Sequence, residues 1–400
     1  MKLLIIAPDF YPSNGGYSNA ITNFVNELSK NDLDIFVYTP RSLGEAAEIN
    51  VNNVKVIRRD YFKYFPALLW EIYSFFKVKT IIKKNNVDII LFETAEFGLM
   101  GYLTANFFPK TLVRIHACTE TEVAVFSKML YEKIAYYFTR LFFNKVEYIL
   151  STNNYHIEFY KEYFAKKNIF KIAKKKFFVV PNIAPDLKKI NNTLGRKDLF
   201  EKYQMDYSDN VRLFFTLGRL NSVGLMQKGM EDLVYAVFLL KNEDENIYGN
   251  IRIFLVGKGE NKNYLIKLTK DLGIKEKFVF LDEMVHDEVL NFMNVSDCVV
   301  LLSRFEGLSM FALEALSCGS LLLFSKSGGI KDLVLDNKNG YLVDTQDVDM
   351  IKEKIKEIIL KNPAEISEMK RKSINYYNNS FRPEKSCKKF IAVLNLIKNI

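Results

Sequence analysis

The chain has 400 residues, of which 49% are apolar and 14% aromatic, which is enough for two domains with a core each. Its net charge of +9 indicates an anionic partner, and no apolar run is long enough for a transmembrane helix. Nucleic acid is disfavoured as that partner because no binding motif is present and the lysines are widely spread. The apolar N-terminus is too short for a signal peptide and continues directly into a predicted strand.

The first predicted strand, Leu3 to Ala7, is typical of a buried parallel strand. A loop from Pro8 to Gly16 then opens a helix predicted from about Tyr17 to Lys30, which is how a Rossmann-like domain begins. Gly15 and Gly16 would allow a ligand to approach the backbone at the carboxyl end of the strand. An ordinary turn would explain the two glycines equally well.

Further strands separated by helical segments predict a parallel sheet that binds ligands at its carboxyl edge. His116 directly follows the predicted strand Leu112 to Ile115 and is therefore a candidate for that edge, although a lone histidine is more often structural. The remaining strands of this half are predicted at Ile35 to Thr39, Val54 to Ile57, Ile89 to Phe92, Tyr148 to Ser151 and Phe177 to Val180.

Two stretches alternate bulky apolar with basic residues, Tyr61 to Lys79 and Val123 to Lys145, and a lysine-rich run extends from Lys161 to Lys176. Aromatic rings and ammonium groups on one helix suit the interface of an anionic membrane. Packed core with solvated lysines is an equal alternative. A reduced, cytoplasmic setting is expected, because no zinc-ligand or Cys-x-x-Cys spacing occurs among Cys118, Cys298, Cys318 and Cys387.

The second half is predicted to begin with the strand Arg212 to Leu217, which is followed by Gly218 and Arg219. Lys228 precedes a helix predicted from Met230 to Lys241. Two Asp-x-Asp pairs occur elsewhere in the chain, but one flanks a strand start and the other opens a helix, where aspartate is a favoured cap. No metal site is predicted.

The segment Val299 to Gly340 predicts a strand, a loop, a helix and a second strand, which together form a βαβ unit. Glu306 lies just before the helix and Glu314 eight positions further on, about 12 Å along the axis of a continuous helix. Free amides of the first helical turn would bind phosphate, and the two carboxylates would accept hydrogen bonds from sugar and ribose hydroxyls. The residues of that turn are Leu308, Ser309, Met310 and Phe311.

This segment resembles the donor-binding signature of the retaining, nucleotide-sugar-dependent glycosyltransferases of family 4, which have the GT-B fold, and the resemblance covers essentially the whole chain. It implies that Glu306 contacts the donor sugar, Glu314 the ribose, and Arg219 and Lys228 the diphosphate. Seven residues, Asn221 to Gln227, separate Leu220 from Lys228, which is more than the family usually has.

The resemblance also implies that the loop with Gly15 and Gly16 faces the donor diphosphate and the acceptor, and that His116 touches the donor sugar. Gly218 is included in the expected donor site. Asp282 and Glu283 stand where the family commonly has a glycine near the base, so the nucleotide stays open.

The expected architecture is α/β GT-B, with two Rossmann-like domains whose parallel sheets face each other across a cleft. The N-terminal acceptor domain would span residues 1–185 and a connecting segment residues 186–210. The nucleotide-sugar domain would span residues 211–379, and a helix at residues 380–400 would pack back on the N-terminal domain.

The expected function is metal-independent transfer of a sugar from a nucleoside-diphosphate sugar to an acceptor hydroxyl, with retained configuration and without a cofactor. The acceptor would be a glycan or a lipid-linked glycan of bacterial cell-surface polysaccharide synthesis, such as lipopolysaccharide, capsule or exopolysaccharide. The protein would be cytoplasmic, with peripheral contact to an anionic membrane. A non-catalytic nucleotide-sugar or membrane-surface binding protein and a glycoside hydrolase are the alternatives.

Overall fold

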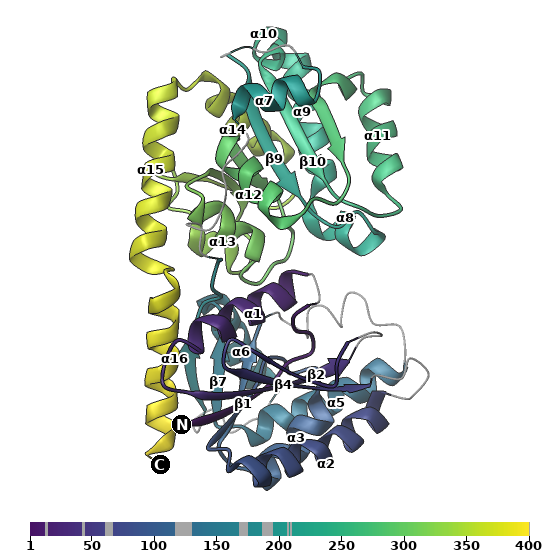
Figure 1. Ribbon diagram of the computed structural model, residues 1–400. Helices are drawn as coiled ribbons and strands as arrows, with labels where there is room; N and C mark the ends of the chain where they lie inside the picture. Colours follow the sequence, from purple (N-terminus) through teal and green to yellow (C-terminus); the bar gives the residue numbers. More distant parts are fainter. Residues whose placement is uncertain are drawn as a thin grey trace. The chain divides into compact units, whose positions relative to one another are not determined.

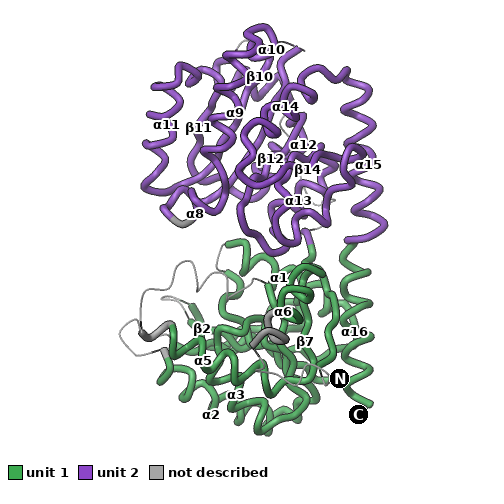
Figure 2. The backbone as a smooth tube through the Cα atoms, turned by 180° about the vertical axis from the view of Figure 1, so that it is seen from behind, with its two compact units in different colours: residues 1–183, 382–400 green, residues 184–381 purple. Residues whose placement is uncertain are grey.

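The computed structural model describes residues 1–12, 15–41, 45–60, 67–116, 130–167, 175–185, 195–205, 208 and 210–399. The chain divides into two compact units, shown in green and purple in Figure 2. Unit 1 comprises residues 1–183 and 382–400, and unit 2 comprises residues 184–381. Each unit is an α/β Rossmann-like domain, as predicted, and each is described separately below.

Unit 1 contains an eight-stranded sheet in the order β3-β4-β2-β1-β5-β6-β7-β8, and every pairing except β3 with β4 is parallel. From β1 the chain first forms β2, β3 and β4 on one side of β1, and then returns to form β5 on the other side. The order therefore reverses between β1 and β5, and in such sheets ligands bind in the crevice beyond the carboxyl ends at this point. The strands are β1 (Lys2–Ile6), β2 (Asp34–Arg41), β3 (Glu48–Val51), β4 (Val54–Asp60), β5 (Ile89–Phe92), β6 (Thr111–Ile115), β7 (Tyr148–Ser151) and β8 (Lys176–Val179).

Helices cover both faces of this sheet, because successive residues of each buried strand point to opposite faces. Leu3 and Ile5 of β1 pack in one core with side chains of α1 and α16, whereas Leu4 and Ile6 pack in another with α2, α3 and α5. Figure 1 shows α16 beside α1 at the sheet. The helices are α1 (Gly16–Leu28), α2 (Ala67–Asn85), α3 (Gly98–Phe107), α5 (Leu130–Lys145), α6 (Asn154–Lys167) and α16 (Pro383–Lys398).

Strand β3 is an antiparallel edge strand that was not predicted from the sequence. Asn52 and Asn53 join β3 to β4, and both have positive φ angles, 49° and 63°. Asparagine tolerates this conformation, and two such residues form the tight turn that suits a hairpin. The sequence Val-Asn-Asn-Val, residues 51–54, therefore contains a local indication of the hairpin.

Unit 2 contains a six-stranded parallel sheet in the order β11-β10-β9-β12-β13-β14. Here the order reverses between β9 and β12, which places the expected ligand crevice beyond the carboxyl ends of these two strands. The strands are β9 (Arg212–Leu217), β10 (Ile251–Val256), β11 (Phe278–Leu281), β12 (Cys298–Leu301), β13 (Leu321–Ser325) and β14 (Gly340–Val343).

Two apolar cores lie on the two faces of this sheet, as the alternation in β9 illustrates. Phe214 packs with α9 and α14, and its neighbours Leu213 and Phe215 pack with α7, α12 and α13. The helices are α7 (Arg196–Lys202), α8 (Ser222–Lys228), α9 (Met230–Glu243), α10 (Glu245–Gly249), α11 (Lys262–Asp271), η3 (Lys275–Lys277), α12 (His286–Val295), α13 (Met310–Ser317), η4 (Ile330–Leu333), α14 (Val348–Leu360) and α15 (Pro363–Ser380).

Helix α7 lies in the stretch predicted as a connecting segment, residues 186–210. Its Leu199 and Phe200 are fully buried in a core of unit 2. The described part of this stretch therefore belongs to unit 2. Helix α16 belongs to unit 1, where Phe390, Val393 and Leu394 are buried.

Candidate functional site

A pair of opposite charges lies at the strand-order reversal of unit 2. The Nζ atom of Lys228 is 2.6 Å from Oε2 of Glu306, and the Ser303 hydroxyl donates to the same oxygen at 3.1 Å. The side chains of Lys228 and Glu306 are 14% and 13% exposed, so the pair is largely screened from water but remains reachable. Two residues that are 78 positions apart in the chain are thus brought into one site.

Helix α8 explains how Lys228 reaches this position despite the seven residues that precede it. The side chain of Asn221 caps the helix by accepting a hydrogen bond from the Gly224 amide at 2.7 Å, and Gly229 ends it in the left-handed conformation. The seven residues between Leu220 and Lys228 thus form the cap and most of this short helix. At Gly218 a Cβ atom would lie 3.0 Å from Cγ of Lys228, so glycine leaves room for the lysine stem.

Arg219 follows Gly218 directly and is exposed. Within the part of the chain that the structure describes, its guanidinium forms no ion pair or side-chain hydrogen bond. A cation without a partner next to the Lys228–Glu306 pair is suited to bind an anion at this edge of the sheet.

Helix α13 begins at Met310, two residues later than predicted, and Ser309 is its N-cap. The two glutamates are therefore not joined by a continuous helix, and the predicted helical spacing does not apply. Leu308 is buried in the core of unit 2. Ser309 makes no side-chain capping bond, and the amides of Met310 and Phe311 belong to the first turn, which has no intrahelical acceptors.

The loop that carries Glu306 is held in place by close contact with a glycine. Gly328 has a φ of +50°, and a Cβ atom there would lie 1.7 Å from the backbone oxygen of Glu306. Only glycine fits this position, both for the backbone conformation and for the space. The Ser-Gly-Gly loop after β13 thus supports the glutamate rather than forming an independent site.

Glu314 is buried, at 5% exposure, and its Oε1 lies 3.0 Å from Nε2 of His286. This hydrogen bond raises the pKa of His286, which favours the charged imidazolium beside the carboxylate. His286 begins α12 and was missed in the sequence analysis. A signal was present, because His286 follows the carboxyl end of β11 within a few residues, the same rule that selected His116.

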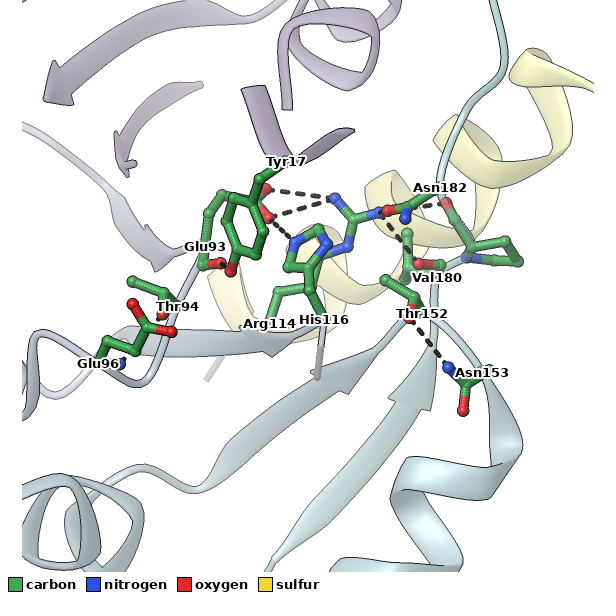
Figure 3. A network of polar contacts seen from close by, with 11 residues as sticks. Tyr17, Glu93, Thr94, Glu96, Arg114, His116, Thr152, Asn153, Val180 and Asn182 are labelled. Carbon is green, nitrogen blue, oxygen red and sulfur yellow. Dashed lines mark hydrogen bonds and ion pairs between the residues drawn. The ribbon is translucent and has the colours of Figure 1, made fainter. Parts of the chain in front are cut away.

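A buried network in unit 1 surrounds His116 (Figure 3). Its Nε2 is 2.7 Å from Oε2 of Glu93, and Nη1 of Arg114 lies 3.3 Å from each oxygen of that carboxylate. Nη2 of Arg114 donates to the carbonyl oxygens of Val180 and Pro181 and to Oδ1 of Asn182. The network thus joins the carboxyl ends of β5, β6 and β8.

Burial and the neighbouring charges of this network determine the protonation state of His116. Burial alone would raise the pKa of Glu93, but the Arg114 guanidinium and the hydrogen bond from His116 lower it below the usual value. Burial lowers the pKa of His116 and outweighs the opposing effect of Glu93. A neutral ring that donates from Nε2 to an ionised Glu93 leaves the lone pair of Nδ1 as an acceptor.

Gly15 and Gly16 lie at the start of α1, and a Cβ atom on either one would meet nothing within 4 Å. Packing therefore does not explain why these positions are glycines. Next to them, the Tyr17 hydroxyl donates to the backbone oxygen of Glu93 at 2.6 Å, and its ring lies 4.8 Å from that of His116. This contact connects the glycine loop to the histidine network.

Several predicted features lie outside the described residues. They are residues 13–14 of the first loop, 61–66 and 123–129 of the two aromatic stretches, 168–174 of the lysine-rich run, and Cys118. The other cysteines, Cys298, Cys318 and Cys387, are free thiols. Over the described residues, no group of three or more His, Cys, Asp or Glu side chains could hold a metal ion, and no helix is long and apolar enough to cross a bilayer.

Two Rossmann-like units, each with polar residues gathered where the strand order reverses, define the GT-B class of folds. Residues 14–182 match the family model "Glycosyltransferase Family 4", and residues 201–396 match "Glycosyl transferases group 1". The chain is therefore a GT-B glycosyltransferase, and it belongs to the family 4 group. The predicted family and fold class are confirmed.

Relatives of known sequence or structure match this chain over most or all of its length. An uncharacterised glycosyltransferase of Methanocaldococcus jannaschii is 25% identical, with 99% of each chain covered. A galactosyltransferase of Escherichia coli, which uses UDP-Gal and a GlcNAc-diphosphoundecaprenol acceptor, is 24% identical over 71% of this chain and 69% of its own. An Anabaena protein solved in complex with UDP has a TM-score of 0.71 at 16% identity and covers 99% of this chain and 100% of its own.

Proposed function

We propose that this glycosyltransferase moves a sugar from a nucleoside-diphosphate sugar to an acceptor hydroxyl with retention of anomeric configuration. The observation that carries the proposal is the Lys228–Glu306 pair together with Arg219, which follows Gly218 and has no ion-pair partner among the described residues. A carboxylate that can accept sugar hydroxyls and cations that can bind phosphate thus lie together where parallel sheets bind nucleotides.

In the proposed reaction, the bond between the anomeric carbon and the diphosphate breaks, and negative charge grows on the leaving phosphate. The acceptor oxygen bonds to the same face of the anomeric carbon, and the acceptor proton passes to the leaving phosphate. Arg219, Lys228 and the first-turn amides of α13 stabilise the growing negative charge, and stabilisation of this kind is usually the largest single contribution to catalysis. Glu306 accepts hydrogen bonds from the donor sugar. Glu314, held by His286 at 3.0 Å, accepts them from the ribose.

His116 orients the donor sugar in this proposal. Its lowered pKa supports a neutral ring at neutral pH, with Nδ1 free to accept a hydroxyl proton in a hydrogen bond. Glu93 is the positioning residue that fixes the tautomer. The acceptor binds at the carboxyl edge of unit 1, where Gly15 and Gly16 leave open space around the backbone.

The reaction is proposed to need no divalent metal, because Arg219 and Lys228 balance the diphosphate charge. Of the two Asp-x-Asp pairs, the second includes Asp347, which caps α14 by accepting from the Met350 amide at 2.9 Å. EDTA is expected to leave the rate unchanged. Loss of transfer in EDTA that Mg²⁺ or Mn²⁺ restores would contradict this part of the proposal.

The pathway we propose is the synthesis of a bacterial cell-surface polysaccharide on a lipid-linked acceptor, in the cytoplasm at the inner face of the membrane. The acceptor named for the E. coli galactosyltransferase supports this assignment. The net charge of +9 would favour an anionic membrane or an anionic lipid carrier. Donor sugar and base stay open.

A panel of UDP, GDP and ADP sugars tests the donor, since a ligand that binds only the folded state raises the unfolding temperature. With the donor and an acceptor that supports turnover, NMR of the product gives the anomeric configuration, and inversion would contradict retention. Glu306→Ala should abolish transfer, whereas Glu353→Ala, on the exposed side of α14, should not. A wild type that binds a donor but transfers to no acceptor would favour a non-catalytic nucleotide-sugar binding protein, and cleavage of a glycoside without nucleotide would favour a hydrolase.

A further inference from the structure

A cavity of about 240 Å³ opens in unit 1 at the carboxyl ends of β2 and β4, separate from the His116 network. It lies beside the middle of α2, on the side of the sheet where β3 forms the edge. Its lining carries more positive than negative side chains. The charged residues are Arg41, Glu48, Arg58, Arg59, Asp60 and Lys77.

Most of these charges are already neutralised by partners. Arg41 pairs with Asp60, Arg58 lies 3.3 Å from the Glu45 carboxylate, and Glu48 lies 3.0 Å from Lys55. Two cations remain. In the described part of the chain, neither Arg59 nor Lys77 has a carboxylate oxygen within 4 Å, and neither side chain donates a hydrogen bond. The cavity therefore has a surplus of two positive charges.

The guanidinium of Arg59 is held in place although it forms no ion pair. Its Cζ lies 3.5 Å from the centre of the Tyr73 ring, which is a cation–π contact. A guanidinium stacked in this way keeps its N–H edge available for a bidentate acceptor such as phosphate. Tyr73 and Lys77 are four residues apart on α2 and so lie on the same side of the helix, which places the ammonium group beside the guanidinium.

Apolar side chains continue from this cavity along α2. Leu69, Ile72, Tyr73 and Phe76 are all exposed, Phe76 to 59%. Their spacing places them on one side of the helix, adjacent to Lys77. A ligand that occupied both features would have a phosphate group at one end and an apolar chain at the other.

We infer that this cavity binds the phosphate of a phosphorylated amphiphile, with Arg59 and Lys77 on the phosphate and the exposed face of α2 along its apolar chain. This inference rests on the proposed function, because such a ligand would be the acceptor or its lipid carrier. The cavity then determines the class of acceptor, whereas Lys228 and Glu306 bind the donor.

Geranyl diphosphate is a suitable probe, and calorimetric titration of the full chain measures its binding. Replacing Arg59→Gln and Lys77→Gln together should weaken binding at least about tenfold, since two hydrogen bonds to a charged group are lost. The matched control is Lys133→Gln with Arg140→Gln on α5, which removes the same charge, including an arginine whose Cζ lies 6.0 Å from the Tyr136 ring. The control should change the affinity by less than about twofold, because rim and surface charges contribute little.

Inorganic pyrophosphate separates a lipid-borne phosphate from a free one. It should bind more weakly than geranyl diphosphate, and Phe76→Ser should weaken only the latter. Equal affinity of the two probes, an equal loss in the control variant, or no binding by the wild type would each overturn the inference. Anion binding at Arg219 would be common to all the variants and cannot mimic the expected difference.

The same proteins distinguish a failure of this inference from a failure of the proposed function. The variants at Arg59 and Lys77 should keep the thermal shift produced by the nucleotide sugar, since neither residue is among those proposed to contact the donor, and Arg219, Lys228 and Glu306 lie in the other unit. A protein that binds geranyl diphosphate through the cavity but no nucleotide sugar would retain the inference and refute the donor assignment. Transfer of the donor sugar to an acceptor at a rate that does not depend on Arg59 and Lys77 would refute the inference and retain the donor assignment.

Discussion

Lys228 and Glu306 form an ion pair of 2.6 Å that joins the end of α8 to the loop after β12. In the proposed site, the pair would hold the carboxylate assigned to the sugar and the ammonium assigned to the phosphate in a fixed relation before any substrate binds. Such preorganisation lowers the reorganisation needed in the transition state.

We expect Lys228→Ala to lower kcat/KM by about 10² to 10³-fold, the range for removal of one group that stabilises a developing negative charge. Glu306→Gln should also lower it, and the double variant should lose less than the product of the two effects, because the residues act together. Steady-state kinetics of the four proteins measures this coupling. Lys241→Ala, at the far end of α9, is the control, and strict additivity of the two losses would contradict the coupling.

Much of the structure of unit 2 could be predicted from the local sequence. Apolar runs gave the strands, and Glu-Gly before an amphipathic helix located Glu306, because these patterns depend on neighbouring residues. The start of α13 was placed two residues too early, since Leu308 is apolar and fits the helical period although it packs before the N-cap. Helix boundaries depend on cap geometry, which the apolar period does not encode.

The partners of the site residues could not be predicted. Glu93 meets His116 across 23 residues, and His286 meets Glu314 across 28, through contacts that exist only once the sheets have formed. Arg114 was a clue, since an arginine inside an apolar strand needs a buried partner. What the sequence does not identify is which carboxylate fills that role.

Gly16→Ala tests whether the glycine is required for folding or for substrate binding. Nothing lies within 4 Å of the added Cβ and Gly16 is the first residue of α1, so the free energy of unfolding should stay the same or rise by up to about 1 kcal/mol. Transfer should fall if the substrate approaches this backbone. Gly249→Ala also places a Cβ atom in a helix where nothing lies within 4 Å, so it should have a similar small effect on stability and leave transfer unchanged. Unchanged kinetics of the Gly16 variant would remove the loop from the substrate site.

Glu93→Ala should lower the free energy of unfolding by about 3 to 5 kcal/mol, because it leaves the buried Arg114 without its carboxylate. His116→Ala keeps the Glu93–Arg114 contact, so it should cost less stability and act mainly on kcat. Glu147→Ala breaks a surface pair with Lys176, both about half exposed, and should cost far less stability because solvent screens the pair. Denaturant unfolding compares the three, and equal losses for Glu93 and Glu147 would contradict a buried ion pair.

His286→Ala tests the second histidine through pH. The pKa of His286 is raised by Glu314, so the imidazolium contributes stability below the ordinary pKa of 6.5, and this contribution is lost as the pH rises through the raised value. The variant should therefore differ more from the wild type at pH 6 than at pH 9, both in unfolding free energy and in KM for the donor. A difference that is the same at both pH values would show that the hydrogen bond has no ionic part.

A buried carboxyl group should make unit 1 less stable as the pH rises toward neutrality. Glu71 of α2 accepts a hydrogen bond from the Met100 amide at 2.9 Å near the start of α3, and burial raises its pKa from 4.5 to about 7. The folded state thus holds this proton more tightly than the unfolded state. Its favourable contribution is complete below pH 4.5 and is lost between pH 4.5 and about 7.

Glu71→Gln keeps the shape of the side chain and an acceptor for the Met100 amide but cannot ionise. A shift of this size corresponds to about 3 kcal/mol, so the variant should gain up to that amount over the wild type between pH 5 and pH 8. Urea unfolding at both pH values measures the gain. Glu158→Gln on α6 carries no buried charge and should show no such trend. A wild type whose unfolding free energy relative to Glu71→Gln is the same at pH 5 and pH 8 would mean that Glu71 is already ionised in the folded protein at the lower pH.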